Sequence, residues 1–207
     1  MKSQTRKEGT LKVGGLYGMD VVKRSMVVWA SFQGLLWLTF AVAYLMNRGA
    51  WINVAEVPPV TAAEGGWLST LLYIIFNNLI VCALIVVGNL FVRFGKITPG
   101  VLVLALQAVM IGWLAGSNGF EIPFPSVASA NLQYLRIGLW ETTSYALLCA
   151  VTLPKSLLIA DAFPATKWES KRKIKDLHFD GAEKITALLG VVILVVAAII
   201  ETRAIFR

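Results

Sequence analysis

The chain has 207 residues, of which 57% are hydrophobic and 15% charged, and its mean hydropathy is +0.70. This composition excludes an ordinary soluble domain and indicates a polytopic helical membrane protein, because apolar runs of about 20 residues recur along the chain. The formal net charge is +7. We attribute this charge to basic loops on the cytoplasmic side of a membrane rather than to nucleic-acid binding.

The residue types that support metal or redox chemistry are scarce. His178 is the only histidine, which excludes most histidine-dependent metal hydrolases. The two cysteines, Cys82 and Cys149, both fall inside apolar runs and have no metal-binding spacing. We therefore expect no metal site, no cofactor and no disulfide framework.

Five apolar runs predict an all-α bundle of five transmembrane helices within residues 25–207. A basic segment, residues 1–24, precedes the bundle, and we expect it to lie along the anionic inner leaflet as a topology anchor rather than as a cleavable signal peptide. The predicted spans are residues 26–46, 67–92, 98–116, 137–160 and 185–203, with a basic cytoplasmic segment at 164–184.

Lysine and arginine are distributed unevenly between the two sides of these spans. Fifteen of the 19 lie in residues 1–24, 93–96 and 155–184, and the other four lie on the opposite side. By the positive-inside rule, the N-terminus is then cytoplasmic and the C-terminus lies outside.

Two adjacent asparagines interrupt the second span. Asn77 and Asn78 lie about ten residues from its outer edge, which at about 1.5 Å per residue is near mid-bilayer. Asparagine at this depth usually forms a hydrogen bond with a neighbouring helix. We favour that structural role, with binding of a ligand or transported ion as the alternative.

Small residues recur at four-residue spacing in the third span. Ala108, Gly112 and Gly116 therefore share one helix face, where a second helix can approach closely. The pattern predicts tight helix packing and leaves a homodimer as a further candidate assembly.

The fourth span carries an acidic residue, Glu141, followed by Thr142 and Ser144. A charged side chain at the bilayer centre costs roughly 2.5 to 3.5 kcal/mol on insertion scales, so it usually turns toward other helices or water. We expect Glu141 to contact an asparagine of the second span or a backbone group of another span. The alternative is a solvated carboxylate at the headgroup level. A helix that begins earlier, within residues 126–135, would put Glu141 deeper.

The segment 164–184 mixes basic and aromatic residues. We expect it to lie on the membrane surface, with docking of a cytoplasmic partner as the alternative, and we expect no nucleic-acid binding. The residues assigned to membrane-surface or partner binding are Lys167, Trp168, Lys171, Arg172, Lys173 and Lys175.

Short motifs in three spans resemble the stage II sporulation protein M family, which is also catalogued as a domain of unknown function in bacteria and archaea. The motifs are Phe76-Asn77-Asn78-Leu79, Gly112-Trp113-Leu114-Ala115-Gly116 with Asn118-Gly119, and Gly138-Leu139-Trp140-Glu141. The last motif departs from the family pattern, because Ile137 stands where the family has a histidine. The resemblance covers roughly residues 25–200.

The resemblance implies a multi-pass protein of a prokaryotic cytoplasmic membrane. It implies that Glu141, the two asparagines and the two glycines define a shared helix core. The sporulation member of the family is a scaffold for partners that remodel peptidoglycan. Other relatives are encoded beside ABC-transporter components or in bacteriocin clusters.

We favour a non-enzymatic scaffold or accessory subunit whose partners are membrane lipids and other subunits, such as an ATPase or a larger membrane complex. The alternative is a transporter, or a permease component associated with an ABC transporter, that uses Glu141, Asn77 and Asn78 as an intramembrane polar site. The small size, the absence of an obvious inverted repeat and the lack of a second buried acid argue against transport. An enzyme is disfavoured because no general base is evident beside Glu141, Ser144 or Cys149.

Overall fold

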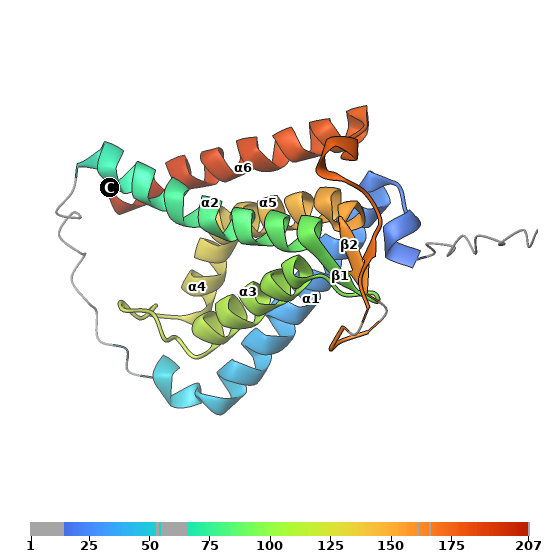
Figure 1. Ribbon diagram of the computed structural model, residues 1–207. Helices are drawn as coiled ribbons and strands as arrows, with labels where there is room; N and C mark the ends of the chain where they lie inside the picture. Colours follow the sequence, from blue (N-terminus) through green and yellow to red (C-terminus); the bar gives the residue numbers. More distant parts are fainter. Residues whose placement is uncertain (1–14, 53, 55–65, 161, 166, 207) are drawn as a thin grey trace, which may run out of the picture.

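The computed structural model describes residues 15–52, 54, 66–160, 162–165 and 167–206, and most of them are helical (Figure 1). The helices are α1 (Val21–Met46), α2 (Trp67–Phe91), α3 (Pro99–Gly116), α4 (Val127–Gln133), α5 (Leu139–Thr152) and α6 (Gly181–Ile205). Short helical turns are η1 (Gly15–Gly18), η2 (Arg48–Trp51), η3 (Tyr134–Gly138), η4 (Leu153–Lys155) and η5 (Ile174–Asp176).

Four of these helices, α1, α2, α3 and α6, are long and apolar enough to cross a membrane. The chain is therefore an α-helical, multi-pass membrane protein. Local capping explains where three of the four begin: Asp20, Thr98 and Asp180 each accept a backbone hydrogen bond from the first turn of α1, α3 and α6.

The shorter helix α5 lies at the centre of the bundle. Nine of its 14 residues are buried, and it packs against α1, α2 and α6. The helical path begins well before it, in α4, and passes through the wide turn η3, where Figure 1 shows α4 set at an angle to α5. An early helical start before Glu141, raised as an alternative from the sequence, is thus present.

The end of the predicted fourth span, 137–160, needs correction. The α-helix stops at Thr152, and Pro154 lies in the tighter turn η4. Proline cannot donate the backbone hydrogen bond that would continue the helix. Residues 158–160 are instead a β-strand.

A small sheet closes one end of the bundle and was not anticipated in an all-α fold. Its strands are β1 (Val92–Phe94), β2 (Leu158–Ala160) and β3 (Glu169–Ser170), in the order β1-β2-β3. β1 pairs with β2 in parallel, and β2 pairs with β3 antiparallel. Part of the segment expected to lie on the membrane surface is therefore a strand tied to the helices.

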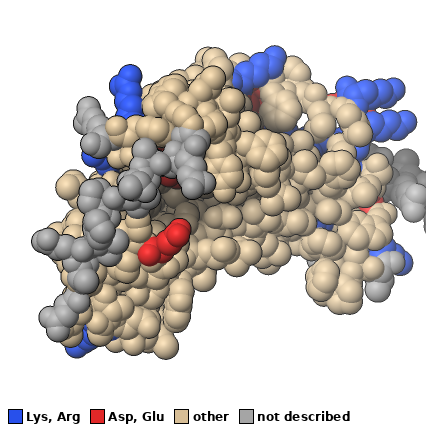
Figure 2. All heavy atoms as spheres, turned by 90° about the vertical axis from the view of Figure 1, so that its left-hand side faces the viewer, with Lys and Arg blue, Asp and Glu red and all other residues tan. Residues whose placement is uncertain are grey.

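We call the end that carries η1, the sheet and the start of α6 the basic end; the C-terminus lies at the opposite end (Figure 1). Figure 2 views the molecule from the C-terminal end. Most of the surface visible there is neither acidic nor basic, and lysines and arginines appear mainly around its edge.

Helices α1 and α3 pack at very short distance. Ala108, Gly112 and Gly116 are all buried on α3. A Cβ atom on Gly112 would overlap the carbonyl oxygen of Leu36, and one on Gly116 would overlap that of Phe40, both on α1. The small-residue face of α3 is therefore occupied by a helix of the same chain.

Candidate functional site

Glu141 lies in the first turn of α5, half-buried between helices. Its Oε1 accepts a hydrogen bond of 2.8 Å from Asn78 Nδ2 on α2. The hydroxyl of buried Tyr145, one turn further along α5, donates to Asn78 Oδ1. Both ends of the Asn78 amide are thus held by α5, and Glu141 contacts another helix instead of standing alone in the headgroup layer.

A second acid faces Glu141. Glu201 on α6 is half-buried, and its carboxyl group lies close enough to that of Glu141 for the two to interact. The expectation that no second buried acid exists is therefore wrong. Glu201 falls near the end of the predicted fifth span, 185–203, and α6 continues through it to Ile205.

The other residues predicted for the polar core are distributed differently. Asn77 is exposed on α2 and does not join Asn78 at Glu141. Thr142 is buried and receives a 3.3 Å hydrogen bond from Gln33 Nε2 of α1. Ser144 is fully buried, and its hydroxyl has no hydrogen-bonding partner within the described part of the chain.

Gln33 belongs to a polar contact that the sequence did not predict. Its Oε1 accepts a 2.7 Å hydrogen bond from Tyr134 OH in η3, and that hydroxyl lies 3.2 Å from Thr142 Oγ1. This triangle fixes the wide turn η3 against α1 and α5. The sequence feature that could have indicated this contact is the single glutamine in the apolar run of the first predicted span, 26–46.

The fully buried amide of Asn89 joins three helices. Its Nδ2 donates to Thr152 Oγ1 at 2.9 Å and to the carbonyl oxygen of Cys149 at 3.2 Å, both on α5. Its Oδ1 accepts from Thr98 Oγ1, the residue that caps α3. Because donor and acceptor are both satisfied, this contact stabilises the crossing of α2, α3 and α5.

A buried ion cluster lies at the basic end. Arg24 of α1 and Glu183 of α6 form an ion pair of 3.2 Å, and Lys155 of η4 binds the other Glu183 oxygen at 2.6 Å. Arg24 also donates to backbone carbonyls of Met19 and Ala150. Arg24 and Glu183 fall in the predicted cytoplasmic segments 1–24 and 164–184. Their pairing could not be predicted, because the two residues are far apart in the chain.

The predicted basic and aromatic surface lies at this same end. Lys167, Trp168, Lys171, Lys173 and Lys175 are exposed, and Arg172 is half-exposed. The Trp168 ring packs on Phe94 of β1, with ring centroids 5.4 Å apart. Lys171 N donates to Leu157 O at 2.8 Å, so the segment is attached to the backbone that follows α5.

Within the described residues, no group of three or more His, Cys, Asp or Glu side chains could hold a metal ion. The buried polar groups instead fall into separate contacts between helices. No family model matches the chain, no curated protein is similar to it in sequence, and no solved structure matches it.

Proposed function

We propose that the chain is a non-enzymatic membrane scaffold or accessory subunit that assembles with other membrane or cytoplasmic proteins. In this proposal it crosses the cytoplasmic membrane of a prokaryote five times, with α5 as the fourth span. Its N-terminus is cytoplasmic and its C-terminus is outside. The basic end then faces the cytoplasm, in agreement with the distribution of lysine and arginine.

The observation that carries this proposal is the rigid attachment of the basic surface to the bundle. Leu157 N donates to Leu90 O at 2.7 Å, and Gly95 N donates to Ala160 O at 2.7 Å. The first bond ties the residue before β2 to the end of α2, and the second extends the pairing of β1 with β2. A partner that docked on Trp168 and the neighbouring lysines would therefore be held in a defined orientation to the membrane helices. Tryptophan is among the residues enriched in interface hot spots.

Membership in the stage II sporulation protein M family remains part of the proposal. Two of the motifs that carry the resemblance meet in space, because Asn78 of the asparagine motif binds Glu141 of the glutamate motif. This contact supports a shared helix core. The expected partners are an ATPase or a larger membrane complex, and a second copy of the chain would be a further one.

The test is purification of the tagged protein in mild detergent, followed by mass spectrometry of the proteins that copurify. We expect a stoichiometric partner, and we expect Trp168→Ala combined with Lys173→Glu and Lys175→Glu to abolish its recovery. Lys184→Glu, a charge reversal at an exposed position on α6, is the matched control and should retain the partner. Recovery of a homogeneous protein without partners under crosslinking conditions would contradict the scaffold role.

One contact favours transport as the second candidate function. Glu141 and Glu201 bring two carboxyl groups together between α5 and α6, beside the Asn78 amide. Such a pair can exchange a proton or a small cation. The Glu141→Gln variant, with expression unchanged, separates the two functions. A transporter should lose flux and keep its partners, whereas a scaffold should lose partner binding or assembly and should show no flux in either form.

A further inference from the structure

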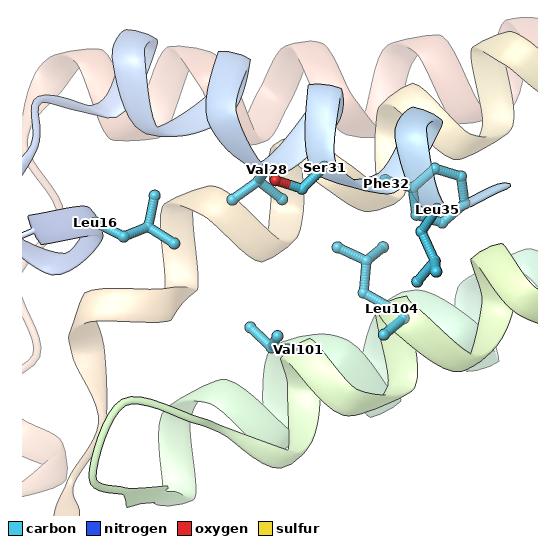
Figure 3. Close-up of a pocket in the computed structure, with 8 residues that line it drawn as sticks. Leu16, Val28, Ser31, Phe32, Leu35, Val101 and Leu104 are labelled. Carbon is cyan, nitrogen blue, oxygen red and sulfur yellow. The ribbon is translucent and has the colours of Figure 1, made fainter. Parts of the chain in front are cut away.

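A narrow apolar groove lies between α1 and α3 near the basic end (Figure 3). Its volume is about 190 Å³. Figure 3 shows Leu16 of η1 at one end of the groove, with side chains of α1 facing Val101 and Leu104 of α3 across it. Both walls belong to membrane-length helices, so the groove lies alongside lipid chains rather than in water.

A cationic group lies directly beyond the Leu16 end. The next residue, Tyr17, donates its hydroxyl to Lys96 O at 3.0 Å. The Arg93 guanidinium sits over the Tyr17 ring, 4.5 Å from the centroid. Arg93 Nε is buried and has no hydrogen-bonding partner among the residues that the structure describes. A buried donor without an acceptor is costly and indicates that an acceptor other than the described residues belongs here.

The sheet adds two further cations to Arg93. Lys171 and Arg172 directly follow β3, and both backbone amides donate to Leu157 O, beside β2. The pKa of Lys171 is lowered by partial burial and then by the positive charges of Arg93 and Arg172, which places both arginines within electrostatic range of Lys171. Arg93 and Glu169 both pair with Ile159 of β2, from opposite sides of that strand. The single negative charge of Glu169 against three positive charges leaves the cluster with an excess of positive charge.

We propose that this place binds one anionic phospholipid, with part of an acyl chain in the α1–α3 groove and the phosphate at Arg93, Lys171 and Arg172. The phosphate supplies the missing acceptor for Arg93 and relieves the repulsion among the three cations. The acyl chain of the bound lipid covers the apolar walls of the groove, which bulk lipid would fill only loosely. A zwitterionic lipid would gain less, because its positive headgroup charge opposes the cluster. The proposal is independent of the scaffold role.

The test is native mass spectrometry of the detergent-solubilised full-length protein after incubation with equal amounts of phosphatidylglycerol and phosphatidylcholine. We expect one phosphatidylglycerol to be retained per chain. Arg93→Gln should reduce the preference for phosphatidylglycerol about fivefold, the change that one basic residue makes toward an anionic lipid surface. Ser31→Phe, at an exposed position in the groove wall, should reduce retention of both lipids.

Matched controls separate this site from general lipid attraction. Lys184→Gln removes one exposed charge on α6, and Ala41→Phe adds the same ring at an exposed position of α1 outside the groove. Both should retain lipid as the unmodified protein does. If Ser31→Phe lowers the melting temperature, Ala105→Phe fills the groove from α3 instead. Equal retention of the two lipids by the unmodified protein, or equal losses in the controls, would overturn the proposal.

Discussion

Arg24 and Glu183 join the first and last membrane-length helices through a buried ion pair with an N–O distance of 3.2 Å. Lys155 shares the same carboxylate. One acidic side chain therefore balances two cations, and it also accepts a hydrogen bond from Asp180 N at the start of α6. We therefore expect the stability of the basic end to depend on the Glu183 carboxylate more than on any exposed charge around it.

Glu183→Gln should destabilise the protein strongly, because the variant leaves two cations without their counter-charge. Removal of one partner from a buried pair costs about 3–5 kcal/mol. Unfolding in a titration of mild detergent with a denaturing detergent measures the loss. Lys23→Gln is the control, since it breaks the exposed Lys23–Asp20 pair, whose loss should hardly change the free energy of unfolding because water screens the two charges. Equal effects of the two substitutions would refute a stabilising role for the cluster.

Asn89→Ala should lower the free energy of unfolding by about 1–3 kcal/mol, because Thr98 and Thr152 lose a buried partner. Asn77→Ala, on the exposed side of the same helix, should change it by about 0.5 kcal/mol or less. The same unfolding titration compares the two. A larger effect at Asn77 would point to a ligand or partner at that asparagine.

Gly112→Val should disrupt the packing of α1 on α3, because the added side chain would overlap the backbone at Leu36. Overpacking of this kind costs about 1–3 kcal/mol or more. Gly34→Ala is the control, since an added Cβ there meets nothing within 4 Å. It should leave the melting temperature unchanged or raise it, because alanine favours a helix more than glycine does.

Labelling of introduced cysteines tests the proposed topology. Glu121→Cys, in the loop before α4, should react with a membrane-impermeant maleimide in intact cells. Lys175→Cys, in η5, should react only after the membrane is permeabilised. The native Cys82 and Cys149 are buried and should add little background. Labelling of both positions in intact cells would exclude an odd number of spans between them.

The long helices could be predicted because hydropathy is a local property of the chain. Runs of apolar residues identify α1, α2, α3 and α6 directly, and Thr98-Pro99 is a recognisable start signal for α3. The small sheet could not be predicted, because its strands have only two or three residues and pair segments far apart in the chain. No periodicity develops over such a length.

The polar contacts were predictable only in part. Glu141 and Asn78 can be recognised as candidates for contacts between helices, because each interrupts an apolar run. Their pairing with one another could not be predicted, because it depends on how α2 and α5 are rotated about their axes. Glu201 and Glu183 read as ordinary chain-end or loop charges in the sequence. Their burial depends on where α6 begins and ends, and helix ends are the least certain feature of a hydropathy profile.

The parallel pairing of β1 with β2 sets an order on the assembly of the chain during synthesis. β1 emerges together with α2, whereas β2 follows only after α3, α4 and α5 have been made. β3 comes later still. The sheet can therefore close only after α3, α4 and α5 have been made, whereas α6 follows β3 in the chain and is not needed for the strands to pair.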